Sequence, residues 1–405
     1  MFLKFYRMLI LHKVPVNLNY AWNAGSMAGF CLVSQIITGL LLTIYYIPSV
    51  DLAFYSVDAI MREVENGWWV RYMHANGASF FFFVVYLHLL RGIYYGSYMP
   101  PRERVWMSGL TMLFLMMGIA FMGYILPWGQ MSFWAATVIT SLINVIPLYG
   151  NELLIYLIGG EYIGLNTLLR FFTLHYLLPF VLFALMLLHI LLLHEVGSNN
   201  PIGIETKVDS ISFHWAYTIK DLLGIWFILF FGSILVYFYP NLLLHPDNYI
   251  PANYMCTPAH IVPEWYFLFF YGVLRLVPDK EGGVILTIIV ILLFYLLPLT
   301  TLINYKNFYV YSGELKFSFF TLTFFIFIIG LFIVSYCGGQ VASRKSIQVG
   351  WRFLLVVLLF LISIPVLEDN FFKNYVNSFI YNHKFTFLDK KVSLCELDNY
   401  KNNFN

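Results

Sequence analysis

Eight long apolar runs divide the chain and constrain its fold more than any other feature. About 20 apolar residues are needed to cross the hydrocarbon core of a bilayer, and each run is about that long. Only 11% of the 405 residues are charged, whereas a soluble domain carries roughly 25%. We therefore predict an all-α integral membrane protein with eight transmembrane helices. The runs cover residues 25–47, 75–96, 106–126, 171–194, 222–240, 283–304, 317–337 and 350–367.

Three long connectors, residues 48–74, 127–170 and 241–282, follow the first, third and fifth runs. Alternate connectors of a multi-pass protein lie on one side of the membrane, so these three should share a face. The opposite face is richer in lysine and arginine, and the positive-inside rule then places both termini on the negative side, which is the matrix or cytoplasm. The net charge of +2 is too small to indicate a nucleic-acid partner.

Four histidines in the second and fourth runs repeat one spacing. His74 and His88 are fourteen residues apart, and so are His175 and His189. In a helix, fourteen steps fall about 40° short of four full turns and rise about 21 Å, so each pair shares one helix face. The two runs are parallel, because one run separates them. His74 should therefore match the depth of His175, and His88 that of His189.

Two imidazoles at each of two depths are what two bis-histidine haems require. The chain has no CxxCH, so these would be non-covalent b haems, with the four histidines as metal ligands. A single intramembrane histidine is more often a packing residue or part of a proton path. Ionisable residues in spans are costly and usually functional, and the repeated spacing favours haem ligation.

Glycines and arginines repeat the pattern of the histidines. Glycine allows the backbone to approach a porphyrin face closely, although ordinary helix contact is the alternative. Arginine pairs well with haem propionates, although arginines near a membrane surface also serve as snorkelling anchors. The glycines are Gly25 and Gly39 in the first run and Gly109 and Gly123 in the third, while Arg71 precedes His74 by three residues and Arg91 follows His88 by three.

Together these residues resemble the cytochrome b family of mitochondria and bacteria over residues 10–370. One chain holds both the histidine bundle and the PEWY stretch, as in the respiratory form of the family, whereas the photosynthetic form divides them between two polypeptides. The resemblance implies a low-potential haem at His74/His175 and a high-potential haem at His88/His189. The matching stretches are WNAGS (22–26), GWWVRYMHANGAS (67–79), GYILPWGQMSFW (123–134), HEVGSNNP (194–201), YTIKDLLG (217–224) and PEWYFLFFYGVLR (263–275).

The resemblance further implies two quinone sites. On the positive face, Glu264 would bond the quinol and relay its proton. Burial beside aromatic residues should raise the pKa of Glu264, and an ion pair with Arg275 is the alternative. The quinol pocket would be lined by Tyr124, Phe121, Pro258, Phe267 and Tyr271. On the negative face, His194 and Asp221 would flank the quinone and deliver protons, and the other residues expected to bind cofactor or quinone are Trp106, Ser198 and Lys220.

The implied protein is the catalytic core subunit of ubiquinol–cytochrome c reductase, respiratory complex III. It would oxidise quinol on the positive side, pass one electron through both haems and reduce quinone on the negative side, coupled to proton translocation. Its partners would be membrane lipid, a Rieske-type iron–sulfur protein, a cytochrome c1-type subunit, the other complex III subunits and a second complex in a dimer. The first fifteen residues show no cleavage site or transit peptide, and we expect the mitochondrial inner membrane rather than a bacterial plasma membrane.

We expect the chain to be organised in three regions. Residues 1–210 would form the haem-binding four-helix bundle with quinone sites, residues 211–370 a second four-helix region with the PEWY loop, and residues 371–405 a polar tail. In one departure from the family, Ala135 replaces the usual glycine and should narrow the quinol pocket. Two alternatives stay open: a di-haem membrane reductase with a non-quinol donor such as ascorbate, and a secondary transporter whose histidines relay protons.

Overall fold

The computed structural model describes residues 12–203, 209–302 and 319–363. Within these ranges, eight helices are long and apolar enough to cross a membrane, which confirms the predicted all-α membrane fold. They are the continuous segment formed by η1 (Tyr20–Asn23) and α2 (Ala24–Thr43), then α4 (Gly67–Tyr94), α5 (Glu103–Ile125), α8 (Leu165–Val196), α9 (Ala216–Phe238), α11 (Lys280–Leu302), α12 (Phe319–Gly339), and a last helix at Arg344–Ser363.

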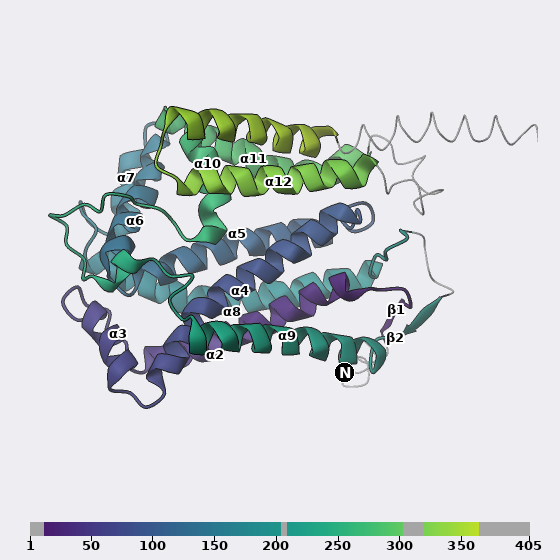
Figure 1. Cartoon of the computed structure of the whole chain (residues 1–405), viewed down its shortest axis with the longest axis horizontal. Coiled ribbons are helices and arrows are strands. Elements are labelled where there is room, and N and C mark those ends of the chain that lie inside the picture. Colours follow the sequence, from purple (N-terminus) through teal and green to yellow (C-terminus); the bar gives the residue numbers. More distant parts are fainter. Residues whose placement is uncertain (1–11, 204–208, 303–318, 364–405) are drawn as a thin grey trace, which may run out of the picture.

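The three long connectors gather at one end of the molecule, on the left of Figure 1, as expected from their alternation along the chain. The first contains α3 (Ala53–Arg62), and the second contains α6 (Gln130–Thr140), η2 (Ser141–Val145) and α7 (Gly150–Ile158). The third contains η3 (Pro246–Tyr249), η4 (Trp265–Phe267) and α10 (Leu268–Leu276). We call the end of the molecule where these three connectors gather the loop end. Strands β1 (Lys13–Pro15) and β2 (Ser210–Ser212) pair at the other end, which we call the strand end.

Several helices begin before the apolar runs that predicted them. Helix α4 starts at Gly67 and α8 at Leu165, whereas their runs start at residues 75 and 171. Hydropathy marks the part of a helix that lies in hydrocarbon, but the hydrogen-bonded helix continues into the polar boundary. At the start of α8, for example, Thr167 Oγ1 accepts a hydrogen bond from the Gly164 N–H at 3.2 Å, so a local cap sets this boundary.

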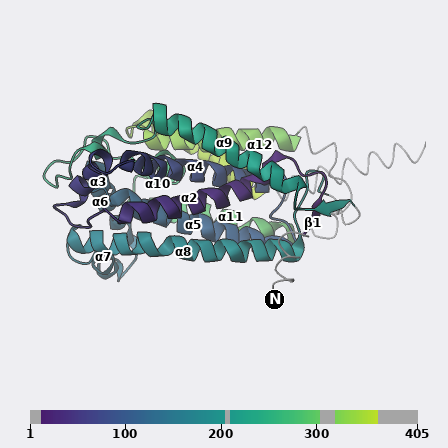
Figure 2. The same ribbon diagram turned by 90° about the horizontal axis from the view of Figure 1, so that it is seen from below.

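The helices pack in two groups. Helix α2 lies along α4, α5 lies along α8, and α9 covers α2 and α4. Helices α10, α11 and α12 form the second group with the last helix, at the top of Figure 1, and α11 joins it to α5. Figure 2 shows the first group, with α2 beside α4 and α5 beside α8. The Trp106 indole N–H donates to the Phe294 carbonyl at 2.8 Å across this junction. Large apolar side chains such as Trp226 and Phe230 are exposed on the outside of α9, as expected for a lipid-facing surface.

Candidate functional site

The four histidines form two pairs inside the bundle. The ring centres of His74 and His175 are 6.2 Å apart, and those of His88 and His189 are 6.4 Å apart. Two imidazoles that bind one metal from opposite sides, through nitrogens about 2 Å from it, place their ring centres roughly 6 Å apart. In the described part of the chain, no group of three or more His, Cys, Asp or Glu gathers to hold a metal. Paired imidazoles therefore fit a metal whose other ligands come with it, as in haem.

Hydrogen bonds orient three of the four imidazoles. His175 Nδ1 lies 2.8 Å from the Ile119 carbonyl, which can only accept, so the proton is on Nδ1. The Thr38 hydroxyl donates to Ser34 O and is left to accept from His74 Nδ1 at 2.9 Å. Ser108 lies 2.8 Å from His189 Nδ1 and likewise donates to the Val105 carbonyl. In each case the Nε2 lone pair is free to bind a metal.

The fourth imidazole is held differently. An Arg91 N–H lies 3.0 Å from His88 Nδ1, and because a guanidinium only donates, this contact makes Nδ1 the acceptor and puts the proton on Nε2. His88 could bind a metal through Nε2 only after Arg91 moves. Arg91 also stacks 5.1 Å over the Trp22 ring, and its Nε is buried with no hydrogen-bond partner among the described residues. Its expected bond to a haem propionate stays a prediction.

Each of the four glycines lies against one of the four imidazoles. A Cβ on Gly25 would lie 3.2 Å from His88 Cε1, and one on Gly39 would lie 3.1 Å from His74 Cε1. A Cβ on Gly109 would lie 3.2 Å from His189 Cε1, and one on Gly123 would lie only 2.3 Å from His175 Cε1. The structure shows that these glycines leave room for the imidazoles, and their expected approach to the porphyrin faces stays a prediction.

We expect Ser108→Ala to weaken haem binding at the His88/His189 level. Removing the group that orients a metal-bound histidine commonly costs about 10–100-fold in metal affinity or activity. Haem loss during detergent washing, followed by the b-type absorbance, measures the effect. Thr111→Ala is the control, since its hydroxyl also bonds a backbone carbonyl, Met107 O at 3.0 Å, but contacts no histidine. Equal haem retention in both variants would contradict the orienting role.

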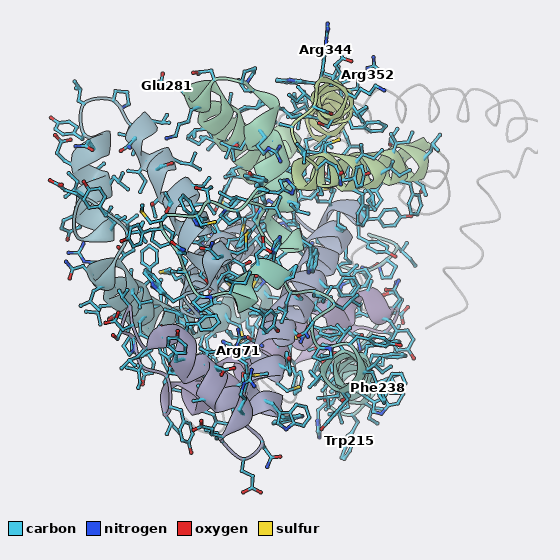
Figure 3. The ribbon with its side chains drawn as sticks, turned by 60° about the vertical axis from the view of Figure 1, so that its left-hand side comes forward. Arg71, Trp215, Phe238, Glu281, Arg344 and Arg352 are labelled. Atoms are coloured by element: carbon cyan, nitrogen blue, oxygen red, sulfur yellow. The ribbon has the colours of Figure 1, made fainter. Side chains whose placement is uncertain are left out.

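A cavity of about 300 Å³ joins the His74/His175 pair to the loop end. Arg71 lines it and lies inside the bundle, whereas Arg344 and Arg352 of the last helix point away from the bundle (Figure 3). One continuous space therefore reaches from the paired imidazoles to a carboxylate. Its polar and glycine lining includes Gln35, Gly39, His74, His175, Gly123, Tyr124, Asn248, Tyr249, His245 and Glu264.

Contacts with α4 hold the PEWY segment at this cavity. The Trp265 indole donates to Ser79 Oγ at 3.1 Å. The Tyr266 ring stacks on Phe82 at 4.2 Å and 1°, and the Tyr86 hydroxyl donates to the Tyr266 carbonyl. The preceding loop is tied to α6, because Asn248 Oδ1 accepts from the Ser132 N–H at 2.9 Å. The residues directly after Glu264 are therefore anchored on α4, and the loop before it is anchored on α6.

Glu264 is a half-buried acid that has no ion-pair partner among the described residues. Burial raises its pKa to about 7, and the Tyr124 hydroxyl partly offsets this shift. Glu264 Oε1 and Tyr124 Oη are both buried with no hydrogen bond of ordinary geometry to any described residue. Arg275 donates to the Gly338 and Gln340 carbonyls at 2.7 and 2.9 Å, so the alternative pairing of Arg275 with Glu264 is wrong. An unpaired acid with a pKa near neutrality is suited to accepting and releasing protons.

The other residues expected at the quinol pocket lie outside the lining of this cavity. Phe121 packs on Phe171, Phe267 packs on Phe82 and Tyr266, and the Tyr271 hydroxyl donates to Ile261 O at 3.1 Å. Pro258 is half-buried in the loop, and Ala135 is buried in α6, so the narrowing expected from Ala135 stays a prediction. Trp106 packs against Tyr98 and Gly92 besides its bond to Phe294, and its expected contact with a cofactor stays a prediction.

The residues expected at the second quinone site lie at the strand end. Asp221 Oδ1 accepts from Ser26 Oγ at 2.6 Å, and Lys220 Nζ donates to the Leu18 carbonyl at 3.0 Å, so α9 is tied to the start of α2. His194 is in the last turn of α8 and stacks on His12, which the sequence argument missed. His12 precedes the first apolar run, and its position depends on the pairing of β1 with β2. Ser198 is half-buried just after α8.

Comparisons with known proteins show which family the chain is similar to. The family described as Cytochrome b/b6/petB matches residues 9–197, and the family described as Cytochrome b(C-terminal)/b6/petD matches residues 251–361. Cytochrome b of Solanum tuberosum is 49% identical over 360 residues, which are 89% of this chain and 90% of that protein. Cytochrome b of Rickettsia bellii is 49% identical over 367 residues, 88% of each chain.

A solved structure titled "Hyperthermophilic respiratory Complex III" superposes with a TM-score of 0.82 at 34% identity, covering 90% of this chain and 95% of that one. The two family matches cover both the histidine bundle and the PEWY region. The alignments with the relatives cover 88–95% of the relatives' own length. The chain belongs to the cytochrome b family.

Proposed function

We propose that this chain is the electron-transfer subunit of a respiratory complex III, where it oxidises quinol at the loop end and reduces quinone at the strand end. The observation that carries the proposal is the cavity shared by the His74/His175 pair and Glu264. It places a proton acceptor and a candidate metal site around one space that a quinol could enter. The likeness to a structure named as a complex III supports the same assignment.

The four histidines would hold two b haems by their Nε2 atoms. When bound, the haems supply one-electron carriers at two depths of the membrane, low-potential at His74/His175 and high-potential at His88/His189. The protein orients three of the imidazoles through Nδ1 and clears space for all four rings with glycines. Arg71 and Arg91 would neutralise the propionates.

At the loop end, quinol loses two electrons and two protons. Glu264 would accept one proton as the carboxylate, and Tyr124 would bond the Glu264 carboxyl group or the substrate hydroxyl. The contacts of Trp265 and Tyr266 with α4 hold Glu264 at the cavity. One electron would pass to a Rieske-type iron–sulfur partner, and the other would cross the membrane.

At the strand end, quinone gains two protons and two electrons, one electron from each of two quinol molecules oxidised at the loop end. His194 and Asp221 would deliver the protons, and Ser198 and Lys220 would help to bind the substrate. This end would face the matrix, so that oxidation releases protons on one side and reduction takes them up on the other. We place the complex in the mitochondrial inner membrane as a dimer, with a cytochrome c1-type subunit and other complex III subunits.

The choice of electron donor tests this proposal against the alternative of another di-haem reductase. We expect quinol, added without oxygen, to convert the b-type centres of the assembled complex to their reduced form within seconds. Ascorbate alone should reduce only a small fraction of these centres. Stopped-flow absorption measures both rates. Rapid reduction by ascorbate together with no response to quinol would reject a quinol-oxidising function.

A further inference from the structure

His12 and His194 form a stacked pair of imidazoles at the strand end. Their ring centres are 4.2 Å apart, with 27° between the ring planes. His12 Nε2 and His194 Nδ1 are both buried with no hydrogen-bond partner among the described residues. Buried polar atoms normally have partners, so two unpartnered nitrogens on adjacent rings are available for a substrate or a proton.

The backbone fixes His12 in this position. Its carbonyl accepts from the Phe213 N–H at 2.8 Å, and the next residue, Lys13, pairs with Ser212 in the two-stranded sheet. The Tyr217 hydroxyl donates to Pro15 O at 2.6 Å. The segment that carries His12 is therefore bound to the start of α9, where Asp221 also lies.

Among the described residues, the other ionisable side chains near this segment are engaged elsewhere or exposed. Lys220 bonds Leu18 O, Asp221 bonds Ser26, His214 lies 3.4 Å from Thr218 Oγ1, and Arg102 donates to Gly197 O at 2.9 Å. The exposed ones are Lys13, Glu195 and Asp209. Burial lowers the pKa of His12, and the neighbouring His194 lowers it further. Two stacked rings at this distance disfavour a double positive charge, so the pair holds at most one extra proton near neutral pH.

We propose that His12 is a positioning and proton-holding partner of His194 in quinone reduction, an inference that rests on the function proposed above. Each quinone takes two electrons and two protons to become quinol. His194 gives one proton to a quinone oxygen, and Asp221 gives the other. Negative charge on the reduced substrate favours protonation of the stacked pair. His12, as the second ring of this pair, therefore helps His194 to regain the proton that it gave to the quinone.

The test is His12→Phe, which keeps a flat ring on His194 but cannot be protonated. The rate of quinone reduction through this end is measured in the whole complex between pH 6 and pH 8, with quinol oxidation blocked. General acid–base groups contribute roughly 10²–10⁴-fold, and a supporting group should contribute less. We expect a loss of about tenfold at pH 8 and little loss at pH 6, where protons are abundant. His214→Phe is the matched control and should match the unmodified protein at both pH values.

Three results would overturn the proposal: a rate equal to that of the unmodified protein at every pH, a loss that does not depend on pH, or the same change in the His214→Phe control. His194→Ala separates this inference from the proposed function. If His194→Ala abolishes quinone reduction and His12→Phe is silent, only the role of His12 is wrong. If both are silent, the quinone reduction site is wrong as well. Should His12→Phe fail to assemble, as judged by b-type absorbance, His12→Gln is measured against the same criteria.

Discussion

Gly123→Ala removes the b-type absorbance of the His74/His175 level and, with it, turnover of the complex. The new Cβ would lie 2.3 Å from His175 Cε1 and 2.9 Å from both ring nitrogens. The imidazole has little room to yield, because its Nδ1 is bound to Ile119 O at 2.8 Å. A displaced ring no longer directs Nε2 at the metal, so we expect haem retention at this level to fall by at least about 10–100-fold, as when an orienting group is lost.

Two other glycines of α5 supply the comparison. Gly118→Ala should leave both centres intact, because no described atom outside its own stretch of helix lies within 4 Å of the Cβ position. Gly109→Ala should have an intermediate effect at the other level, since its Cβ would lie 3.2 Å from His189 Cε1. Reduced-minus-oxidised absorption spectra of the three purified variants rank the effects. Loss of haem from Gly118→Ala, or full retention in Gly123→Ala, would refute the steric role.

Glu264→Gln lowers the rate of quinol oxidation by about 10²-fold or more, within the range usual for a general base. Glutamine is close in size to glutamate but cannot accept the proton of the quinol. The pKa of Glu264 is about 7, so the carboxyl group is largely protonated below pH 7 and unable to act as a base. The rate in the unmodified protein should therefore rise as pH increases through 7 and level off above it, whereas the residual rate of the variant lacks this step.

Steady-state rates between pH 5.5 and pH 8.5 measure both effects. Glu281→Gln is the control, because Glu281 is also at the loop end but is exposed in the first turn of α11. Its rate and pH profile should equal those of the unmodified protein. An unchanged profile in Glu264→Gln would show that another group accepts the proton.

The sequence was sufficient to predict the spans and the histidine pairs, because both follow from regular geometry. A run of apolar residues needs no tertiary information to be placed in lipid, and a fourteen-residue spacing places His74 and His88 on one face of any straight helix. Two parallel helices then bring His74 to His175 and His88 to His189, at 6.2 and 6.4 Å. Those pairs required no knowledge of loops.

The parts that sequence reasoning missed depend on contacts between distant segments. The role of Gly123 beside His175 required the spacing of α5 and α8. His12 reaches His194 only because β1 pairs with β2, roughly two hundred residues later in the chain. Trp106 faces Phe294 on α11 because the two helix groups meet there. None of these contacts leaves a periodic signal in the sequence.

A redox-titrated absorption spectrum of the purified complex tests the central claim most directly. Two imidazole pairs at two depths predict two b-type centres of different midpoint potential, and His175→Leu should remove one of them while His189→Leu removes the other. A spectrum with a single centre, or a protein that binds no haem after reconstitution, would contradict the assignment of these four histidines.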